Sequence, residues 1–178
     1  MQTFGSLTIR PALDHPDLLG DPVRVASASW EHADAVGVAE IDPDLAETAA
    51  MTDAYDVPIE ASANCVVVMG RRGGEERTAA CVVRADTRAD VNNVVKRTLD
   101  VRKASFLDHD RAVAETGMAY GGITPIGLPA GWRLLVDSAV ADIETAIIGS
   151  GIRGSKLFLP GELLARLPGA ETITDLAR

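Results

Sequence analysis

Apolar residues occur in short runs along the chain, and glycine, proline and charged residues separate these runs. Residues 35–41 alternate between small and larger apolar types, while 64–69 and 79–84 are continuous runs rich in valine and alanine, as is typical of strands. The pair Gly73-Gly74 lies between the last two runs and predicts the tight turn of a hairpin. Three later apolar runs predict further strands, at 134–136, 146–148 and 157–159.

Small or apolar residues at helical spacing alternate with these runs. They predict helices that begin at Asp42, Asp90 and Asp108, because aspartate accepts hydrogen bonds from the free N–H groups of a helix start. The third of these helices should end at Gly117, and a short last helix should open near Pro160.

The order of these elements mixes strands and helices without strict β-α-β alternation. It predicts an α+β fold, with a mixed, partly closed β-sheet flanked by helices. Residues 1–34 are rich in proline and glycine turns, and we expect an extended appendage that packs on the same domain. Residues 35–178 then form the domain itself.

The net charge and the lengths of the apolar runs indicate which partners the chain should not bind strongly: nucleic acids over the whole surface, and membranes. The formal net charge is −9, which disfavours strong binding of DNA or of any nucleic acid over the whole surface. Lysines and arginines in the central and later parts of the chain still leave room for a local basic strip. No apolar run approaches the roughly 18–20 residues of a membrane span, and the first residues do not resemble a leader, so we expect a cytoplasmic protein without membrane contact.

Several familiar motifs are present only in part. Residues 149–154 spell Gly-Ser-Gly-Ile-Arg-Gly, but an apolar strand pattern follows them where a dinucleotide site needs a helix. Asp108-His109-Asp110 are adjacent on a predicted helix and point in different directions, so we interpret them as a helix start. Cys65 and Cys81 lie in valine-rich runs and should be buried thiols. No serine-nucleophile or metal-ligand pattern appears, and we expect no metal and no cofactor.

The most informative segment is 121–129, which reads Gly-Gly-Ile-Thr-Pro-Ile-Gly-Leu-Pro. Its glycines allow a ligand to approach backbone N–H groups, and its prolines lower the entropy cost of holding one shape. The segment resembles the Gly-Gly-x-(Ser/Thr/Cys)-Pro-x-Gly signature of the YbaK-like, prolyl-tRNA-synthetase-associated family of aminoacyl-tRNA editing domains. The resemblance extends in the same order over roughly residues 35–176.

This resemblance implies an aminoacyl-tRNA deacylase: a freestanding hydrolase that removes a wrongly esterified amino acid from tRNA, without metal or cofactor. The backbone N–H groups of the loop would hold the ester carbonyl and its developing charge. The implied partners are the acceptor end of tRNA, through weak local contact, and a synthetase. The implied catalytic residues are Gly121, Gly122 and Thr124, and the implied substrate-binding residues are Asn64, Pro125, Gly127, Gly149 and Gly151.

One position departs from the family pattern. At the start of the first pocket strand the family usually has a lysine followed by threonine or serine, where this chain has Asn64-Cys65. Asparagine keeps hydrogen-bonding capacity but lacks the charge and reach of lysine. Either Asn64 serves an altered substrate geometry, or the domain is a catalytically reduced module that binds an aminoacyl-nucleotide-like ligand or a protein partner. Hydrolysis of another small ester, without tRNA, is a third reading.

Overall fold

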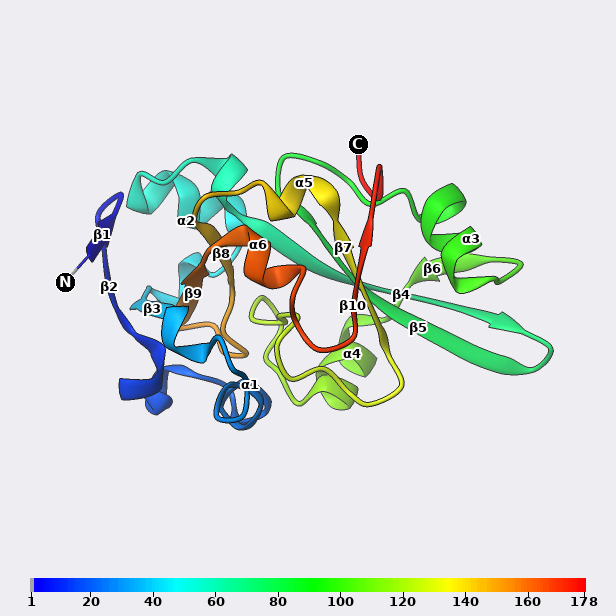
Figure 1. Ribbon diagram of the computed structural model, residues 1–178, viewed down its shortest axis with the longest axis horizontal. Coiled ribbons are helices and arrows are strands. Elements are labelled where there is room, and N and C mark those ends of the chain that lie inside the picture. The colour runs from blue at the N-terminus through cyan, green and yellow to red at the C-terminus, as the bar shows by residue number, and fades with distance from the viewer. Residues whose placement is uncertain (1) are drawn as a thin grey trace.

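The computed structural model describes residues 2–178, and its strands form two five-stranded sheets (Figure 1). The first sheet is antiparallel throughout, with the strand order β1-β2-β3-β9-β8. Its strands are β1 (Gln2–Phe4), β2 (Leu7–Pro11), β3 (Gly37–Glu40), β8 (Ala146–Gly149) and β9 (Ser155–Leu159).

The second sheet is mixed and has the order β10-β7-β5-β4-β6. Its central ribbon is a long antiparallel hairpin whose turn contains Gly73 and Gly74, both with positive φ, as the sequence predicted. β7 runs parallel to both β5 and β10, while β6 pairs antiparallel with β4. The strands are β4 (Ala63–Arg72), β5 (Glu75–Arg84), β6 (Ala104–Phe106), β7 (Arg133–Asp137) and β10 (Ala170–Ile173).

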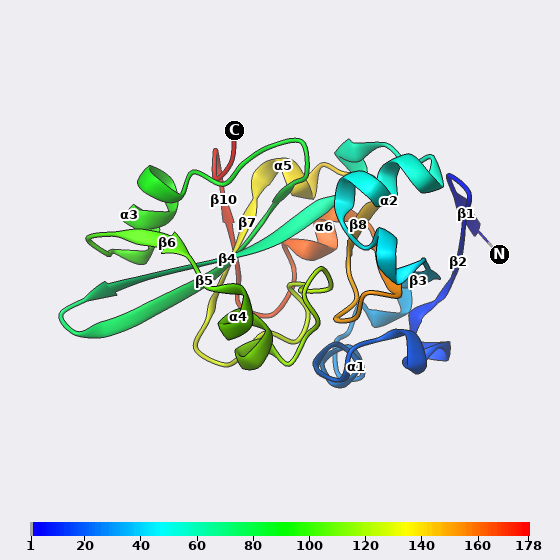
Figure 2. The same cartoon turned by 180° about the vertical axis from the view of Figure 1, so that it is seen from behind.

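Short helices flank the two sheets, as the two opposite views show (Figures 1 and 2). The helix predicted from Asp108 is present: its side chain caps the first turn by accepting from the Arg111 N–H, and Gly117 ends the helix with φ 66°. The helices are α1 (Asp21–Ser27), α2 (Thr48–Tyr55), α3 (Lys96–Leu99), α4 (His109–Thr116), α5 (Ser138–Ala141) and α6 (Gly161–Leu164). No helix within residues 2–178 is long and apolar enough to cross a membrane.

The two sheets share one hydrophobic core. Val38 and Leu157 from the first sheet and Val82 and Val136 from the second belong to a single buried cluster. A lone parallel bridge between Ser62 and Ile147 joins the sheets at the start of β4. The α+β class is therefore confirmed, and the strands predicted as one partly closed sheet are divided between two sheets that meet at this bridge.

The N-terminal segment continues the first sheet. β2 pairs with β3, and Leu7 and Ile9 are buried against the second hydrophobic cluster. The segment also contains α1, which the sequence pattern did not predict, and Val23 of this helix is completely buried. Met1 lies outside the described residues, and the domain boundary at residue 34 stays a prediction.

Two of the predicted helices start differently from the sequence expectation. Asp42 caps only a 3-10 turn, Pro43–Leu45, and α2 begins three residues after that turn, at Thr48. Asp90 caps a π-helical turn, Val91–Val95, which leads into α3. In both cases the aspartate accepts a backbone N–H as expected, but the turn that follows has a different hydrogen-bond spacing.

Candidate functional site

A gap opens where the two sheets separate. On the side of β4 away from β5, strand pairing with β6 covers only Val68 to Gly70. Before that stretch, Leu107 donates its N–H to the carbonyl of Val67 at 2.8 Å, and the bridge at Ser62 closes the other end. The first half of β4 therefore presents an edge that no strand covers.

A cavity of about 510 Å³ fills this gap. β4 and α2 form one wall, and the start of α4 and the end of β6 form another. The third wall consists of the loop after α4 together with β8 and β9. The polar groups that reach the cavity from these walls include Glu47, Thr48, Asn64, His109, Gly121 and Lys156.

The glycine-proline loop is held by close backbone contacts. The Gly122 N–H donates to the carbonyl of Ala119, and the Gly122 carbonyl accepts from the Gly151 N–H at 2.8 Å. A Cβ atom on Gly122 would lie 2.6 Å from the carbonyl oxygen of Ile152, and one on Gly149 would lie 2.5 Å from that of Gly122. Backbone therefore packs on backbone here, which only glycine permits.

This packing leaves part of the loop free to bind. Gly121 and Ile123 line the cavity, and among residues 2–178 neither of their N–H groups has a hydrogen-bond acceptor. Gly121 has φ 81°, a conformation that strains any other residue. Two unpaired donors on a fixed loop can hold a carbonyl oxygen or an oxyanion.

Lys156 places a cation at the inner end of the cavity. It lies on β9, it is 6% exposed, and its Nζ donates to the carbonyl of Ala46 at 2.8 Å and to that of Gly121 at 3.3 Å. Burial lowers the pKa of its ammonium to about 8, against the opposing effect of the nearby Glu47 carboxylate. The charge on this lysine is therefore sensitive to pH near neutrality, and its position is tied to the glycine-proline loop.

Asn64 supplies an amide at the first pocket strand. The hydroxyl of Thr48 on α2 donates to its Oδ1 at 2.8 Å, and the Nδ2 group takes no part in this bond. Both residues line the cavity. The amide nitrogen carries two N–H donors, and no described residue accepts from them, so Asn64 can donate to a bound ligand.

Cys65 also lines the cavity, but its environment disfavours the reactive form. Burial raises the pKa of the Cys65 thiol, and the proximity of Cys81 raises it further. Burial likewise raises the pKa of Cys81 to about 12. Since the thiolate is the nucleophilic form, both groups are inert thiols at neutral pH, and both are free cysteines.

A charged pair lies beside the Gly121 backbone. The Arg153 guanidinium donates to the carbonyls of Pro43 and Tyr120, each at 3.1 Å, and lies 3.9 Å from the Glu47 carboxylate. The side chains of Arg153 and Glu47 are partly exposed, at 35% and 58%. Arg153 therefore fastens the glycine-proline loop to the segment before α2.

The structure brings together three of the eight site residues expected from the sequence. Asn64, Gly121 and Gly149 line the cavity. The other five lie behind its surface: Gly122, Thr124, Pro125, Gly127 and Gly151. Their predicted roles stay predictions.

The contacts of these five residues are with the scaffold. Thr124 is fully buried, and its hydroxyl has no hydrogen-bond partner within the described chain. A Cβ on Gly127 would meet the carbonyl of Pro22 at 2.4 Å, and one on Gly151 would meet Gly20 at 3.0 Å. These glycines join the loop to the start of α1.

Sequence reasoning missed Lys156 as a site residue. The only signal was a lysine inside the apolar strand Ser155–Leu159, in which every residue is buried. A buried lysine in a strand requires acceptors, and this one finds them in two loops distant in sequence.

Two motifs are placed as expected. Residues 149–154 form the turn of the β8–β9 hairpin rather than the start of a helix, and Asp108 caps α4. Within residues 2–178 no group of three histidine, cysteine or acidic side chains is arranged to hold a metal ion.

The sequence is similar to a known family of domains and to parts of known proteins. A family model described as an aminoacyl-tRNA editing domain matches residues 42–167. The chain is similar to the proline–tRNA ligase of Listeria monocytogenes serotype 4a (strain HCC23), with 29% identity over 113 residues, which are 63% of this chain and 19% of that ligase. The proline–tRNA ligase of Listeria welshimeri serovar 6b is 30% identical over 100 residues, which are 56% of this chain and 16% of that ligase. The chain thus spans under a fifth of the length of these curated relatives.

Solved structures share the fold. One is described as a proposed trans-editing enzyme for prolyl tRNA synthetase; it has a TM-score of 0.73 and 16% identity, and covers 94% of this chain and 98% of that chain. Another is the hypothetical protein APE2540, with a TM-score of 0.66 and 20% identity over 75% of this chain and 85% of that chain. At these identities the likeness concerns the fold alone.

Proposed function

Because this chain belongs to the aminoacyl-tRNA editing domain family, we propose that it hydrolyses the ester bond of mischarged aminoacyl-tRNA, acting without attachment to a synthetase. The observation that carries the proposal is that Gly121 and Ile123, whose N–H groups have no acceptor among residues 2–178, line a cavity that also contains a buried lysine. A cavity of about 510 Å³ has room for an amino acid and the ribose that bears it.

The ester carbonyl would lie against the glycine-proline loop. As water adds to the carbonyl carbon, negative charge develops on the carbonyl oxygen, and the N–H groups of Gly121 and Ile123, two residues that line the cavity, would stabilise it. The bond between that carbon and the ribose oxygen then breaks, and the ribose oxygen takes a proton. The products are a free amino acid and a tRNA with its terminal hydroxyl restored.

Lys156 would assist in two ways. Its ammonium donates to the Gly121 carbonyl and so fixes the peptide unit that lies between the two units bearing the N–H donors. Its positive charge, held in a buried setting, also favours charge developing on a nearby oxygen. We assign Gly122 and Thr124 to holding the shape of the loop, since neither lines the cavity.

The substrate itself would supply the remaining specificity. Since one methylene changes binding by only about 1–3 kcal/mol, synthetases that confuse small amino acids require a second hydrolytic site. The acceptor end of tRNA would make weak local contacts, in keeping with the acidic chain, and a synthetase would be the source of the mischarged species.

The direct test is the release of radiolabelled amino acid from a panel of correctly and incorrectly charged tRNAs by the isolated chain. We expect release from one mischarged species, unchanged by a chelator. Gly121→Ala should abolish it, because Gly121 has φ 81° and a Cβ there would lie 2.8 Å from the Arg153 guanidinium. Gly131→Ala is the matched control, since Gly131 has φ 87° and a Cβ there meets nothing within 4 Å.

The outcome also separates the alternatives. Release from simple amino acid esters but from no charged tRNA would indicate a hydrolase for other small esters. No release from any substrate by folded protein would overturn the hydrolase and favour a module that binds an aminoacyl-nucleotide-like ligand or a protein partner.

A further inference from the structure

Exposed apolar side chains gather at the mouth of the cavity. Within residues 2–178 five large hydrophobic side chains are exposed, and three of them, Ile59, Phe106 and Tyr120, line this cavity. The protein is poor in aromatic residues, which make up 4% of the chain. Two aromatic side chains exposed to water at one opening are unfavourable compared with the same side chains buried in the core. Such an exposed apolar patch is typical of a binding surface.

The two aromatic rings come from different segments. Phe106 is the last residue of β6 and is 62% exposed. Tyr120 immediately precedes the glycine-proline loop and is 48% exposed. The ring of His109, the first residue of α4, lies against Tyr120 with ring centroids 4.7 Å apart and an interplanar angle of 40°. All three side chains line the same opening.

The chemistry of the proposed substrate determines what must lie at this opening. An aminoacyl ester is attached to the ribose of the terminal nucleotide, and the base of that nucleotide is attached to the same ribose. If the acyl group lies against Gly121 inside the cavity, the base therefore lies at the mouth. An unpaired base binds proteins largely by stacking on aromatic side chains.

We propose that Phe106, Tyr120 and His109 form a stacking platform for the unpaired terminal base of the acceptor end. This inference rests on the proposed function, because it places the acyl group in the cavity. It assigns the mouth to the nucleoside part of the substrate and the interior to the amino acid.

Four cations without an ion pair among residues 2–178 precede Phe106 in the sequence. Lys96, Arg97, Arg102 and Lys103 form no ion pair with another residue in the described part of the chain. They lie on α3 and on the segment that enters β6, which Figures 1 and 2 both show beside each other. Lys103 is three residues before Phe106, or roughly 10 Å along an extended strand.

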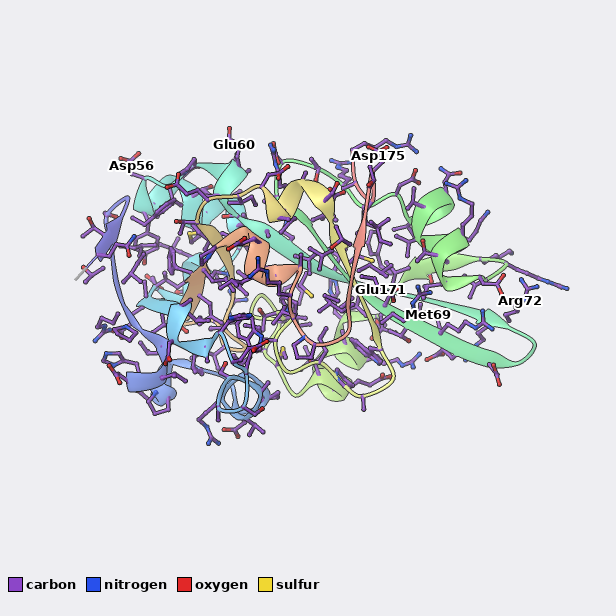
Figure 3. All side chains as sticks on the ribbon, in the orientation of Figure 1. Asp56, Glu60, Met69, Arg72, Glu171 and Asp175 are labelled. Carbon is purple, nitrogen blue, oxygen red and sulfur yellow. The ribbon has the colours of Figure 1, made fainter. Side chains whose placement is uncertain are left out.

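Neighbouring basic residues form ion pairs. Arg72 and Arg77 pair with Asp100, and Arg111 pairs with Glu76. Figure 3 shows Arg72 at the hairpin end of β4, well beyond Met69. The cations without an ion pair in the described chain therefore lie on α3 and on the segment that enters β6, and we place the phosphates that precede the terminal nucleotide beside them.

The test compares substrates with and without the base. Phe106→Ala should raise KM for mischarged tRNA by about tenfold, the scale of one lost base stack, with kcat nearly unchanged. Phe106→Trp should restore the wild-type KM. Val25→Ala is the matched control, since Val25 on α1 is 64% exposed and does not line the cavity.

Hydrolysis of the corresponding amino acid ethyl ester, which has no base, should be the same in Phe106→Ala and in the wild type. An unchanged KM for tRNA in an active Phe106→Ala protein would overturn the platform. So would an equal loss on tRNA and ethyl ester, which would place Phe106 in the acyl site instead.

A binding measurement keeps this inference separate from catalysis. The probe is a 3′-aminoacylamido-adenosine, whose amide resists hydrolysis, titrated against wild type and Phe106→Ala. We expect about tenfold weaker binding by the variant. If the wild type releases no amino acid but binds the probe in a Phe106-dependent way, the proposed hydrolysis fails and the platform stands. If the wild type and the variant bind the probe equally, the platform fails whatever the activity.

Discussion

The interior and the mouth of the cavity are built by opposite means. At the interior, Lys156 is 6% exposed and is held by two carbonyls, and Gly149 packs directly against the backbone of Gly122. At the mouth, Phe106 and Tyr120 are 62% and 48% exposed. The interior is fixed by hydrogen bonds and close contacts, whereas the mouth offers apolar area to a ligand.

The two regions should therefore affect different kinetic constants. Fixed donors in a buried setting stabilise charge that develops during reaction, so changes there should lower kcat. Exposed rings bind ground state and transition state alike, so changes there should raise KM with little effect on kcat. An interior variant that only raises KM, or a mouth variant that only lowers kcat, would contradict this assignment.

Of the variants that distinguish the interior from the mouth, Lys156→Met should have the largest effect. Methionine fills similar space without charge, which removes the cost of burying the ammonium but leaves the carbonyls of Ala46 and Gly121 without this donor. The variant should fold but lose about 100-fold in kcat, comparable to removal of one oxyanion donor. Thermal unfolding tests whether the variant folds, and single-turnover hydrolysis measures the loss of rate. A rise in KM at constant kcat would instead indicate that Lys156 contributes to substrate binding, like the residues of the mouth.

Lys156 also gives stability and activity opposite dependences on pH. Its folded pKa is lowered from 10.5 to about 8, so the unfolded state binds more protons between these values. Its contribution to stability therefore rises as pH increases from about 8 toward 10.5, while activity that needs the ammonium falls over the same range. The facing charged groups are Glu47 and Arg153. Denaturant unfolding and kcat measured from pH 7 to about 10 test this, and Lys156→Met should flatten both profiles.

The next largest effect is expected at Gly149. A Cβ there would lie 2.5 Å from the Gly122 carbonyl oxygen and 2.8 Å from that of Ile123, so backbone must shift. Gly149→Ala should lower the free energy of unfolding by roughly 1–3 kcal/mol. The control is Gly154→Ala in the same hairpin turn, where a Cβ meets nothing within 4 Å. Equal stability of the two variants in urea would show that the interior tolerates movement.

A smaller effect is expected from Asn64→Lys, which installs the residue that the family usually has. In this fold the cavity already holds the ammonium of Lys156, and the new lysine would lose the bond between Thr48 and Asn64. We expect about a tenfold loss of kcat/KM, as two like charges share one cavity. Thr48→Val, which removes only the hydrogen bond, serves as the reference. A gain of activity in Asn64→Lys would instead indicate a catalytically reduced site.

The sequence predicted the framework of this molecule better than its site. The β4–β5 hairpin followed from valine-rich runs around Gly73-Gly74, and α4 followed from its cap at Asp108 and its stop at Gly117. These signals are local. The short strand β6 and the split of the strands into two sheets depend on long-range pairing, which no local pattern encodes.

The same reason explains what was found and missed in the cavity. Gly121 belongs to a segment whose unusual composition was visible, Asn64 was singled out by the family resemblance as a departure from lysine, and both line the cavity. Lys156 reaches it only because β9 lies beside β8 and its side chain extends to the carbonyl of Ala46, 110 residues away in sequence. Phe106 became notable only through its exposure, which requires the fold.

The smallest effect is expected on the path to the mouth, from Lys103→Gln. Each phosphate contact with a single strand contributes a slope of about −0.7 in log affinity against log salt, so losing one should raise KM for tRNA about threefold to fivefold at about 0.1 M salt. Arg88→Gln is the control, because Arg88 is exposed, has no ion pair among the described residues and does not line the cavity.

The salt series separates this effect from stacking. Lys103→Gln should reduce the slope of log KM against log salt by about 0.7 and should converge with wild type at high salt. Phe106→Ala should shift the whole line upward with its slope unchanged, because stacking releases no counterions. Parallel lines for Lys103→Gln would mean that the cations along α3 and β6 do not meet phosphate. The mouth would then recognise the terminal nucleoside alone, and the negative net charge of the chain would keep the rest of the tRNA at a distance.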